Sequence, residues 1–420
     1  MLSCPASSRH RRDRFVNKDG AGIMMRVAHL LSHPIQYKSP LLRRIAREPD
    51  IKLTVFFRSD FSVRSYFDEG FGVPVRFDVD LLGGFDHQFL PSFAGRDKIS
   101  FLFPTNYGLR SRLADNRFDA IWIHGYGTPY NLYAMMLAKS LGLTVLLTDE
   151  AHARSRVRGA ADELKAKAVF AIVRNCVDRF LTIGSANREY LISRGLSAKK
   201  MFLFPYAIDN SWFKPKDAGS RGTAKEKLLA ELGAESPRSV VLFASKLIRR
   251  KRCADLVGAF ARLNLDSVVP RPLLVLVGDG EDRENVLGLI DRHNLKNDVK
   301  FLGFRNQSEL PLLYQAADVF VLPSDSEPWG LVINEAMIAG CAVISGDEVG
   351  SAYDLIKEGE NGYVFPAGDI DALSEKLRLS LSTPGWLEAA SAASQRRVAA
   401  WDFEADIKGF REALGLPPRA

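Results

Sequence analysis

Residues 318–347 decide the fold, and they read DVFVLPSDSEPWGLVINEAMIAGCAVISGD. The stretch opens with a short apolar run, passes through a polar turn, continues as a segment of helical length and closes on a second apolar run. Apolar strands that alternate with helices are typical of a parallel sheet covered on both faces. The stretch therefore predicts one strand–helix–strand unit of an α/β fold.

The same alternation extends along most of the chain, in two series. The strand candidates of the first series are RVAHLLS, KLTVFF, AIWIHG, LTVLLTD and RFLTIGS. Those of the second series are SVVLFAS, PLLVLVGDG, VKFLGF, DVFVLPS, CAVISGD and GYVFPAG. Each series predicts a doubly wound parallel sheet. Ligands of such open sheets bind beyond the carboxyl ends of the strands. We therefore expect two Rossmann-like domains that face each other across a cleft, with the chemistry in the loops after the strands.

The pattern divides the chain into five parts. The first is a basic, polar N-terminal stretch without the apolar core of a signal peptide, which we interpret as disordered; the alternative is a basic arm that contacts a membrane. A proline-rich and Lys/Gly-rich stretch between the two series is typical of a linker. The predicted parts are a disordered extension at 1–24, a first Rossmann-like domain at 25–212, a linker at 213–237, a second Rossmann-like domain at 238–398, and a C-terminal helix at 399–420 that packs back on the first domain.

The composition excludes several classes of protein. The 420 residues are 46% hydrophobic and 25% charged, with 57 Lys and Arg against 50 Asp and Glu, which is globular composition with a net charge of +7. No apolar run approaches the roughly 18 residues that a membrane-spanning helix needs. The four cysteines are widely spaced, which argues against a disulfide framework or a zinc site and favours a cytoplasmic protein.

The strongest candidate site lies in the turn after the strand DVFVLPS. Glu327 lies in the loop and Glu335 about one turn into the next helix, so both carboxylates can face one ligand. The backbone N–H groups of Trp329, Gly330 and Leu331 open that helix and can hold a phosphate. Charged acceptors beside such a site suit sugar hydroxyls. The alternative is a pair of surface acids near a helix N-terminus, where the helix dipole favours them.

A second candidate is the basic segment SKLIRRKR at 245–252. Lys246 follows a strand and Lys251 precedes the next helix, so the two ammonium groups can neutralise a diphosphate and stabilise it as a leaving group. We expect Arg249, Arg250 and Arg252 to be solvated. Five basic residues in seven would also fit a nucleic-acid-binding protein, but the aromatic residues of single-strand binders and the motifs of DNA-binding proteins are missing.

Residues 240–377 resemble the donor domain of retaining glycosyltransferases of the GT-B fold, family 4, also called glycosyl transferases group 1. The spacing of Glu327 and Glu335 matches that family's E-x7-E motif. The segment around Lys246 and Lys251 resembles its G-R-L…K-G segment, and LVLVGDG resembles its V-G-D-G strand end. The region VISGDEVGSAYDLIKEGENGYVFPAGD is similar to the one that closes the family's donor site.

The resemblance implies roles for the residues that match. Glu335 would bind ribose hydroxyls, while Glu327 and the amides of residues 329–331 would hold the transferred sugar and the distal phosphate. Lys246 and Lys251 would clamp the diphosphate. Lys246 stands where the family usually has arginine, so the charge is kept but bidentate phosphate contact is lost.

Two further positions follow from the same resemblance. Phe304 and Arg305, after the strand end FLG, would lie near the nucleotide base. Ser351 stands where a second glycine is common in the family. Neither this departure nor the lysine at 246 is expected to abolish donor binding.

The first series offers fewer candidates. Its first strand ends in SHPIQY at 32–37, without the Gly-Gly turn of many family members. His124 follows another strand beside two glycines and is our first choice for a catalytic residue here. Asp149, Glu150 and His152 follow the next strand, where many relatives carry a histidine facing the sugar.

The expected function is transfer of a hexose-type sugar from a nucleotide diphosphate to an acceptor hydroxyl, with retained anomeric configuration. The acceptor would be a glycan or lipid-linked saccharide of cell-surface polysaccharide or glycolipid synthesis, reached at the inner face of an anionic membrane. We expect no cofactor and no metal, because the lysines and the helix N-terminus replace a cation. The alternatives are a GT-B nucleotide-sugar epimerase and, with less support, a basic nucleic-acid-binding protein.

Two other enzyme classes are disfavoured by missing motifs. An oxidoreductase would need a dinucleotide loop, but Arg283 occupies the place of the third glycine in G-x-G-x-x-G. A phosphorylase of the same architecture would need the context of a pyridoxal lysine, which the chain does not show.

Overall fold

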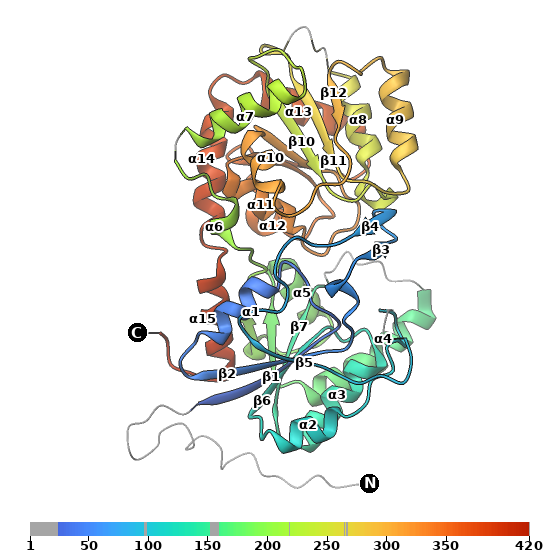
Figure 1. Cartoon of the computed structure of the whole chain (residues 1–420), viewed down its shortest axis with the longest axis vertical. Helices are drawn as coiled ribbons and strands as arrows, with labels where there is room; N and C mark the ends of the chain where they lie inside the picture. Colours follow the sequence, from blue (N-terminus) through green and yellow to red (C-terminus); the bar gives the residue numbers. More distant parts are fainter. Residues whose placement is uncertain are drawn as a thin grey trace.

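The computed structural model describes residues 24–95, 99–151, 159–217, 219–263, 265 and 268–419. Two domains lie one above the other in Figure 1, each built on a parallel sheet with helices on both faces. This is the predicted architecture. The expected disordered extension at 1–24 lies outside the described residues except for Met24, and so does His152.

The first domain contains a seven-stranded sheet in the order β5-β2-β1-β6-β7-β8-β9, and every neighbouring pair is parallel. Its strands are β1 (Met25–Leu31), β2 (Ile51–Phe57), β5 (Asp86–Phe89), β6 (Ala120–His124), β7 (Thr144–Asp149), β8 (Arg179–Thr182) and β9 (Met201–Leu203). A separate antiparallel hairpin consists of β3 (Tyr66–Asp68) and β4 (Val73–Val75). The five predicted strands are all present. The short strands β5 and β9 and the hairpin add to them.

Helices cover both faces of the first sheet and connect its strands. They are α1 (Ser39–Ala46), α2 (Leu109–Asp115), α3 (Pro129–Ser140), α4 (Gly159–Cys176) and α5 (Ser185–Ser193). Side chains that alternate along a strand enter opposite cores. From β1, Ala28 and Leu30 pack with α2 and α3, whereas Val27 and Leu31 pack with α1.

The second domain contains a six-stranded parallel sheet in the order β12-β11-β10-β13-β14-β15. Its strands are β10 (Val240–Ala244), β11 (Leu273–Val277), β12 (Val299–Phe301), β13 (Val319–Leu322), β14 (Ala342–Gly346) and β15 (Gly362–Phe365). Its helices are α8 (Cys253–Ala261), α9 (Arg283–Arg292), α10 (Leu310–Ala316), α11 (Leu331–Ala339), α12 (Ala352–Leu355), α13 (Ile370–Ser382) and α14 (Trp386–Val398).

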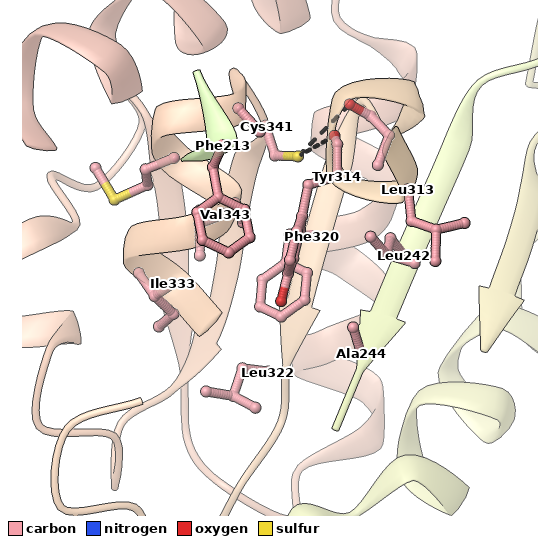
Figure 2. Close-up of a cluster of buried hydrophobic side chains, with 14 of the residues drawn as sticks. Phe213, Leu242, Ala244, Leu313, Tyr314, Phe320, Leu322, Ile333, Cys341 and Val343 are labelled. Atoms are coloured by element: carbon pink, nitrogen blue, oxygen red, sulfur yellow. Dashed lines mark hydrogen bonds between the residues drawn. The ribbon is translucent and has the colours of Figure 1, made fainter. Parts of the chain in front are cut away.

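Both faces of the second sheet are buried. Val241 and Phe243 of β10 pack into a core with α8, α9 and α13, whereas Leu242 and Ala244 pack on the opposite face with α10 and α11. Figure 2 shows this second core, in which Tyr314 of α10 lies among apolar side chains and its ring centroid is 5.6 Å from that of Phe320. Full burial on both faces explains why these strands are continuous apolar runs.

The stretch 213–237 differs from the expected linker. The chain passes from the first domain to the second in α6 (Asn210–Phe213), and α7 (Ser220–Glu231) then forms three turns of helix. Leu228 and Leu229 of α7 are buried in the core shared with α10. The Lys and Gly residues that suggested a linker lie on or before a helix whose apolar side chains recur at helical spacing, and this pattern outweighs the composition.

The C-terminal helix returns to the first domain. α15 (Phe403–Leu414) packs against α1, β8 and β9, and Phe410 lies in the core beneath the first sheet. Arg411 of α15 binds Glu48 and Asp50 of the first domain, at 2.9 and 2.7 Å. The two domains are therefore connected twice, through residues 204–213 and through the segment between α14 and α15.

Two sequence expectations concern smaller features. The described cysteines, Cys176, Cys253 and Cys341, are free thiols, and Cys4 lies outside the described residues. Among the described residues, no helix is both long and apolar enough to cross a lipid bilayer.

The topology fixes where a ligand can bind. The chain reverses direction across each sheet between a central strand and its neighbour, at β1 and β6 in the first domain and at β10 and β13 in the second. The loops beyond the carboxyl ends of these strands open toward the other domain (Figure 1). Crevices at such switch points are the ligand sites of open α/β sheets.

Candidate functional site

A cavity of about 330 Å³ lies between the two domains. It is lined by every predicted site residue of the second domain: Lys246, Lys251, Phe304, Arg305, Glu327, Trp329, Gly330, Leu331 and Glu335. The first domain contributes Gln36, Tyr37, Phe71, Phe77, Glu150 and Tyr206. The predicted convergence of two carboxylates and two lysines on one gap is therefore present in the structure.

The turn before α11 is held in place by a buried side chain and by close packing. Trp329 is 2% exposed, and its indole N–H donates to Asn334 Oδ1 at 3.0 Å. Gly330 has a φ of +90°, which favours glycine, and a Cβ there would lie 3.0 Å from Leu322. The first N–H groups of α11 point toward the cavity end of the helix, where helices hold anions.

Glu335 is a buried carboxyl group in α11, 8% exposed. It accepts a hydrogen bond from the Tyr314 hydroxyl at 2.7 Å. Burial raises the pKa of Glu335 to about 7, and the hydrogen bond from Tyr314 opposes this rise. A carboxyl group in this state gains from a ligand that donates hydrogen bonds to it, as two neighbouring hydroxyls of a ribose would.

Glu327 is held by two cations of the basic segment. Lys251 forms an ion pair with Glu327 Oε2, and Arg250 Nη1 lies 3.2 Å from the same oxygen. Arg250 also donates to the Ser326 carbonyl at 2.8 Å. The expectation that Arg250 is merely solvated was wrong: the side chain is 45% exposed but lines the cavity and binds the loop.

Lys251 is 7% exposed, the lowest exposure among the cationic side chains of the cavity. Burial lowers its pKa, and the attraction of Glu327 opposes this. Arg249 of the same turn is exposed, whereas Arg252 binds Asp255 and Asp325 at 2.6 and 3.1 Å. The basic segment therefore presents Lys251 to the cavity and uses Arg252 to fix the turn.

Lys246 contacts two residues of the first domain. Its Nζ lies 2.7 Å from Asp68 Oδ1 and 4.7 Å from the ring centroid of Phe71. That ring in turn meets Phe304 edge to face, with centroids 4.9 Å apart. Asp68 and Phe71 were not predicted, because nothing in a short hairpin indicates from sequence that it reaches the other domain.

The glycine loop after β11 supports the basic segment. A Cβ at Gly278 would lie 1.9 Å from the Ser245 carbonyl oxygen, and one at Gly280 would lie 2.4 Å from the Leu247 oxygen. Both glycines also have positive φ. The V-G-D-G motif therefore lets two loops pack backbone to backbone behind Lys246, which is a structural role and not a dinucleotide site.

A buried polar network lies on the first-domain side. Lys38 Nζ is 2.8 Å from His124 Nδ1, His124 Nε2 is 3.0 Å from Glu150 Oε1, and the Tyr206 hydroxyl donates to the same oxygen at 2.5 Å. Lys38 Nζ also lies 2.9 Å from His124 Nε2, so the ammonium group lies beside both ring nitrogens. Burial lowers the pKa of His124, and the charge of Lys38 lowers it further.

His124 does not line the cavity, and Glu150 and Tyr206 do. The predicted catalytic histidine therefore reaches a ligand only through Glu150. Burial would raise the pKa of Glu150, but its hydrogen bond and attraction to His124, with Lys38, lower it to about 2. The charged carboxylate of this side of the cavity is thus Glu150, one of several polar residues that the sequence placed at that strand end.

The two domains are also joined beside the site. Ser185 of α5 donates its backbone N–H and its hydroxyl to Asp354, at 2.9 and 2.5 Å. A Cβ at Gly184 would lie 2.4 Å from the Trp329 ring, so the first domain packs directly on the turn that begins α11.

Comparisons with known proteins agree with this geometry. The family described as "Glycosyl transferases group 1" matches residues 224–397. The second domain therefore matches this family, and the whole chain has the GT-B fold. The turn before α11, the basic segment and the glycine loop all lie within the matched residues.

Related proteins and structures extend the match. An N-acetyl-alpha-D-glucosaminyl L-malate synthase of Bacillus anthracis is 25% identical over 65% of this chain and 69% of its own length. The sulfoquinovosyl transferase SQD2 of Arabidopsis thaliana is 25% identical over 73% of this chain and 59% of its own length. The structure of HepE from Anabaena with UDP covers 94% of this chain and all of its own, at 18% identity and a TM-score of 0.71, and it shows the shared fold.

Proposed function

We propose that this protein is a retaining hexosyltransferase that moves a sugar from a nucleotide diphosphate to an acceptor hydroxyl. One observation carries the proposal: Glu327, Glu335, Lys246 and Lys251 line a single cavity between two GT-B domains. Two acidic groups that suit hydroxyls and two cations that suit a diphosphate match the parts of a nucleotide sugar.

In the proposed complex, the donor lies along the second domain. The ribose hydroxyls donate to Glu335, and the diphosphate lies between Lys246, Lys251 and the N-terminus of α11. The sugar meets Glu327, whose Oε2 is already engaged by Lys251 and Arg250. The other oxygen of that carboxylate can accept a sugar hydroxyl, so the ion pair orients a sugar-binding group.

The proposed reaction breaks the bond between the anomeric carbon and the distal phosphate oxygen. The acceptor oxygen forms a new bond to that carbon on the same face, and the acceptor proton passes to the leaving phosphate oxygen. Catalysis then rests on positioning and on stabilising the negative charge of the departing diphosphate. Lys251 is suited to that second task because burial strengthens its field at close range.

The acceptor would enter from the first-domain side, where Glu150 and Tyr206 line the cavity. Glu150 is charged and fixed by His124, so it can accept a hydrogen bond from an acceptor hydroxyl. His124 acts in this proposal as a positioning residue behind Glu150. The proposal needs no cofactor and no metal, because the cations already present serve the diphosphate.

The proposed acceptors are glycans or lipid-linked saccharides of cell-surface polysaccharide or glycolipid synthesis. An O-antigen chain mannosyltransferase B of Escherichia coli, 30% identical over 39% of this chain, supports this class by its name. Work on a lipid carrier would place the protein in the cytoplasm, at the inner face of an anionic membrane. Equal flotation with vesicles of phosphatidylcholine alone and with added phosphatidylglycerol would contradict the membrane contact.

The test of the proposed function is a thermal-shift panel of nucleotide sugars, followed by NMR of the product. A bound donor stabilises the native state, so the correct donor raises Tm. The product of transfer should keep the anomeric configuration of the donor. An inverted product would refute the retaining mechanism, and conversion of the donor to its epimer without transfer would favour an epimerase. Absence of any nucleotide-sugar binding would refute the function as a whole.

A further inference from the structure

One wall of the cavity is built by a segment that leaves the first domain. Residues 66–78, which we call the crossing segment, contain the hairpin β3–β4 and end at Asp78. Figure 1 shows β3 and β4 beside the second domain, away from the seven-stranded sheet that precedes and follows them in sequence. Two aromatic side chains of this segment, Phe71 and Phe77, line the cavity.

The crossing segment is fastened to the second domain along the loop after β12. Asn306 Nδ2 donates to the Arg76 carbonyl at 2.8 Å, and the Ser308 hydroxyl donates to Asp78 Oδ2 at 2.5 Å. Asn306 also lines the cavity. These bonds bring the first-domain segment to the loop that carries Phe304 and Arg305.

A second attachment lies at the hairpin tip. Asp68 binds Lys246 at 2.7 Å and accepts the backbone N–H groups of Gly70 and Phe71 at 2.9 and 3.0 Å. The Gly70 carbonyl packs so close to Gly280 that a Cβ there would lie 2.7 Å from it. One carboxylate therefore fixes both the turn and its position against the second domain, which sets the direction of the Phe71 ring.

The Phe71 ring contacts both Lys246 and Phe304. Its centroid is 4.7 Å from Lys246 Nζ and 4.9 Å from the Phe304 centroid, at an interplanar angle of 77°. Phe71 is only partly buried and its ring borders the cavity. Phe67 of the same hairpin is 62% exposed and does not line the cavity.

We infer that Phe71 is a donor-binding residue, and that the first domain thereby completes the nucleotide subsite by stacking on the nucleobase beside Phe304. The inference rests on the proposed function, since it requires a nucleotide donor in this cavity. Every nucleobase has a π-face that stacks on an aromatic ring. Lys246 is placed to hold the diphosphate of the same ligand, so base and phosphate would be held at neighbouring points.

The test compares ligands with and without a base. The probes are UDP, GDP and ADP, of which the tightest is carried forward, and inorganic pyrophosphate as the ligand without a nucleoside. Calorimetry gives the Kd of each probe for the full chain. In Phe71→Ala we expect the Kd of the nucleoside diphosphate to rise about tenfold, the order that one base–aromatic contact contributes. The Kd of pyrophosphate should change less than twofold.

Two control variants sharpen the result. Phe67→Ala removes an aromatic ring from the same hairpin without touching the cavity, so both Kd values should stay at the wild-type level. Phe71→Trp keeps an aromatic face and should restore nucleoside diphosphate binding to within a few-fold of the wild type. Thermal melts of all variants report whether the fold is kept.

Several outcomes would overturn the inference. The first is an unchanged Kd of the nucleoside diphosphate in Phe71→Ala. The second is an equal loss of affinity for the nucleoside diphosphate and for pyrophosphate. The third is tighter binding of the nucleoside diphosphate, which would mean that the Phe71 ring obstructs the cavity. In each of these cases the wild type still binds a nucleoside diphosphate, so the proposed function stands. If the wild type binds none of the three nucleotides, the proposed function and this inference fall together.

Discussion

The two walls of the cavity are built differently. On the second-domain wall, one turn and one basic segment supply most of the polar groups, because Glu327 and Glu335 lie eight residues apart and Lys246 and Lys251 five. On the first-domain wall, the network joins residues from four distant parts of the chain: Lys38, His124, Glu150 and Tyr206. In the proposed complex, one compact motif would hold the donor, whereas the acceptor would meet a surface assembled from distant parts of the chain.

The charges of the two walls differ as well. The second-domain wall presents lysines to the cavity, with carboxylates as their partners. The first-domain wall keeps its cation behind the surface: burial lowers the pKa of Lys38 to about 8, and the carboxylate of Glu150 faces the cavity. The anionic donor and the hydroxyl-bearing acceptor would thus meet walls of matching character.

The largest expected effect comes from removing the buried cation of the second-domain wall. Lys251→Ala should lower kcat/KM for the donor by about a thousandfold, the upper range for loss of one group that stabilises transition-state charge. Glu327 keeps Arg250 as a partner, so the fold should survive. Steady-state kinetics and a thermal melt measure both. The matched control is Arg249→Ala, an exposed residue of the same turn, which should keep nearly normal turnover. Near-normal turnover of Lys251→Ala would refute the clamp.

The next effect concerns the buried carboxyl group of α11. Glu335→Gln should raise the donor KM by roughly ten- to a hundredfold, because hydrogen bonds to a charged acceptor are stronger than those to an amide. The measurement is donor KM with a nucleotide sugar, whose phosphates do not titrate near neutral pH. An unchanged KM would contradict the ribose assignment.

The same residue predicts a pH dependence. The raised pKa of about 7 means that Glu335 is protonated below neutral pH in the free enzyme and ionised above it. Donor kcat/KM should therefore fall as the pH drops below 7, by at most the roughly ten- to hundredfold expected for Glu335→Gln, and level off above pH 7. Burial also raises the pKa of Asp149 to about 7, so titration of Asp149 is the alternative cause of such a fall in kcat/KM. If the fall below pH 7 persists in Glu335→Gln, the titrating group is not Glu335.

A smaller effect is expected on the other wall. Glu150→Gln removes the charge that accepts from Tyr206 and His124, so acceptor KM should rise about tenfold while donor Kd stays constant. Tyr206→Phe removes one of these bonds and should have a weaker effect of the same kind. Kinetics with varied acceptor and calorimetry with donor separate the two walls. If Glu150→Gln weakens donor binding as much as acceptor binding, the two walls do not act independently.

The sequence predicts the second-domain wall well because its information is local. Strands buried on both faces are readable as apolar runs, and Glu327 and Glu335 are close because a short turn joins the strand β13 to the helix α11. The same holds for Lys246 and Lys251, which flank one loop. These features depend on chain geometry over a few residues, so a pattern is sufficient.

The first-domain wall could not be predicted in the same way, because its geometry is set by tertiary contacts. His124 is the last residue of β6 and Glu150 follows β7, and only the packed structure shows that Glu150 faces the cavity while His124 lies behind it. Tyr206 lies after an unpredicted edge strand. The helix α7 was mistaken for a linker because its polar composition hides the two leucines that dock it. Asp68 lies in a hairpin whose partner is another domain.

The smallest expected effect arises where the two walls touch. Asp68 forms an ion pair with Lys246, which would also bind the diphosphate of the donor. The Asp68 carboxylate lies 2.7 Å from Lys246 Nζ, so its negative charge repels an incoming phosphate. Asp68→Asn keeps an oxygen that can accept from Gly70 and Phe71 but removes the charge. We expect the Kd of pyrophosphate to fall a few-fold at low salt, and the difference from wild type to shrink as salt screens the charges.

The matched control is Glu69→Gln, which changes an exposed acid next in sequence and should change the Kd of pyrophosphate little. Weaker binding in Asp68→Asn would show instead that the carboxylate positions Lys246 for the ligand, and that the donor site depends on the first domain for its electrostatics as well as for its aromatic wall.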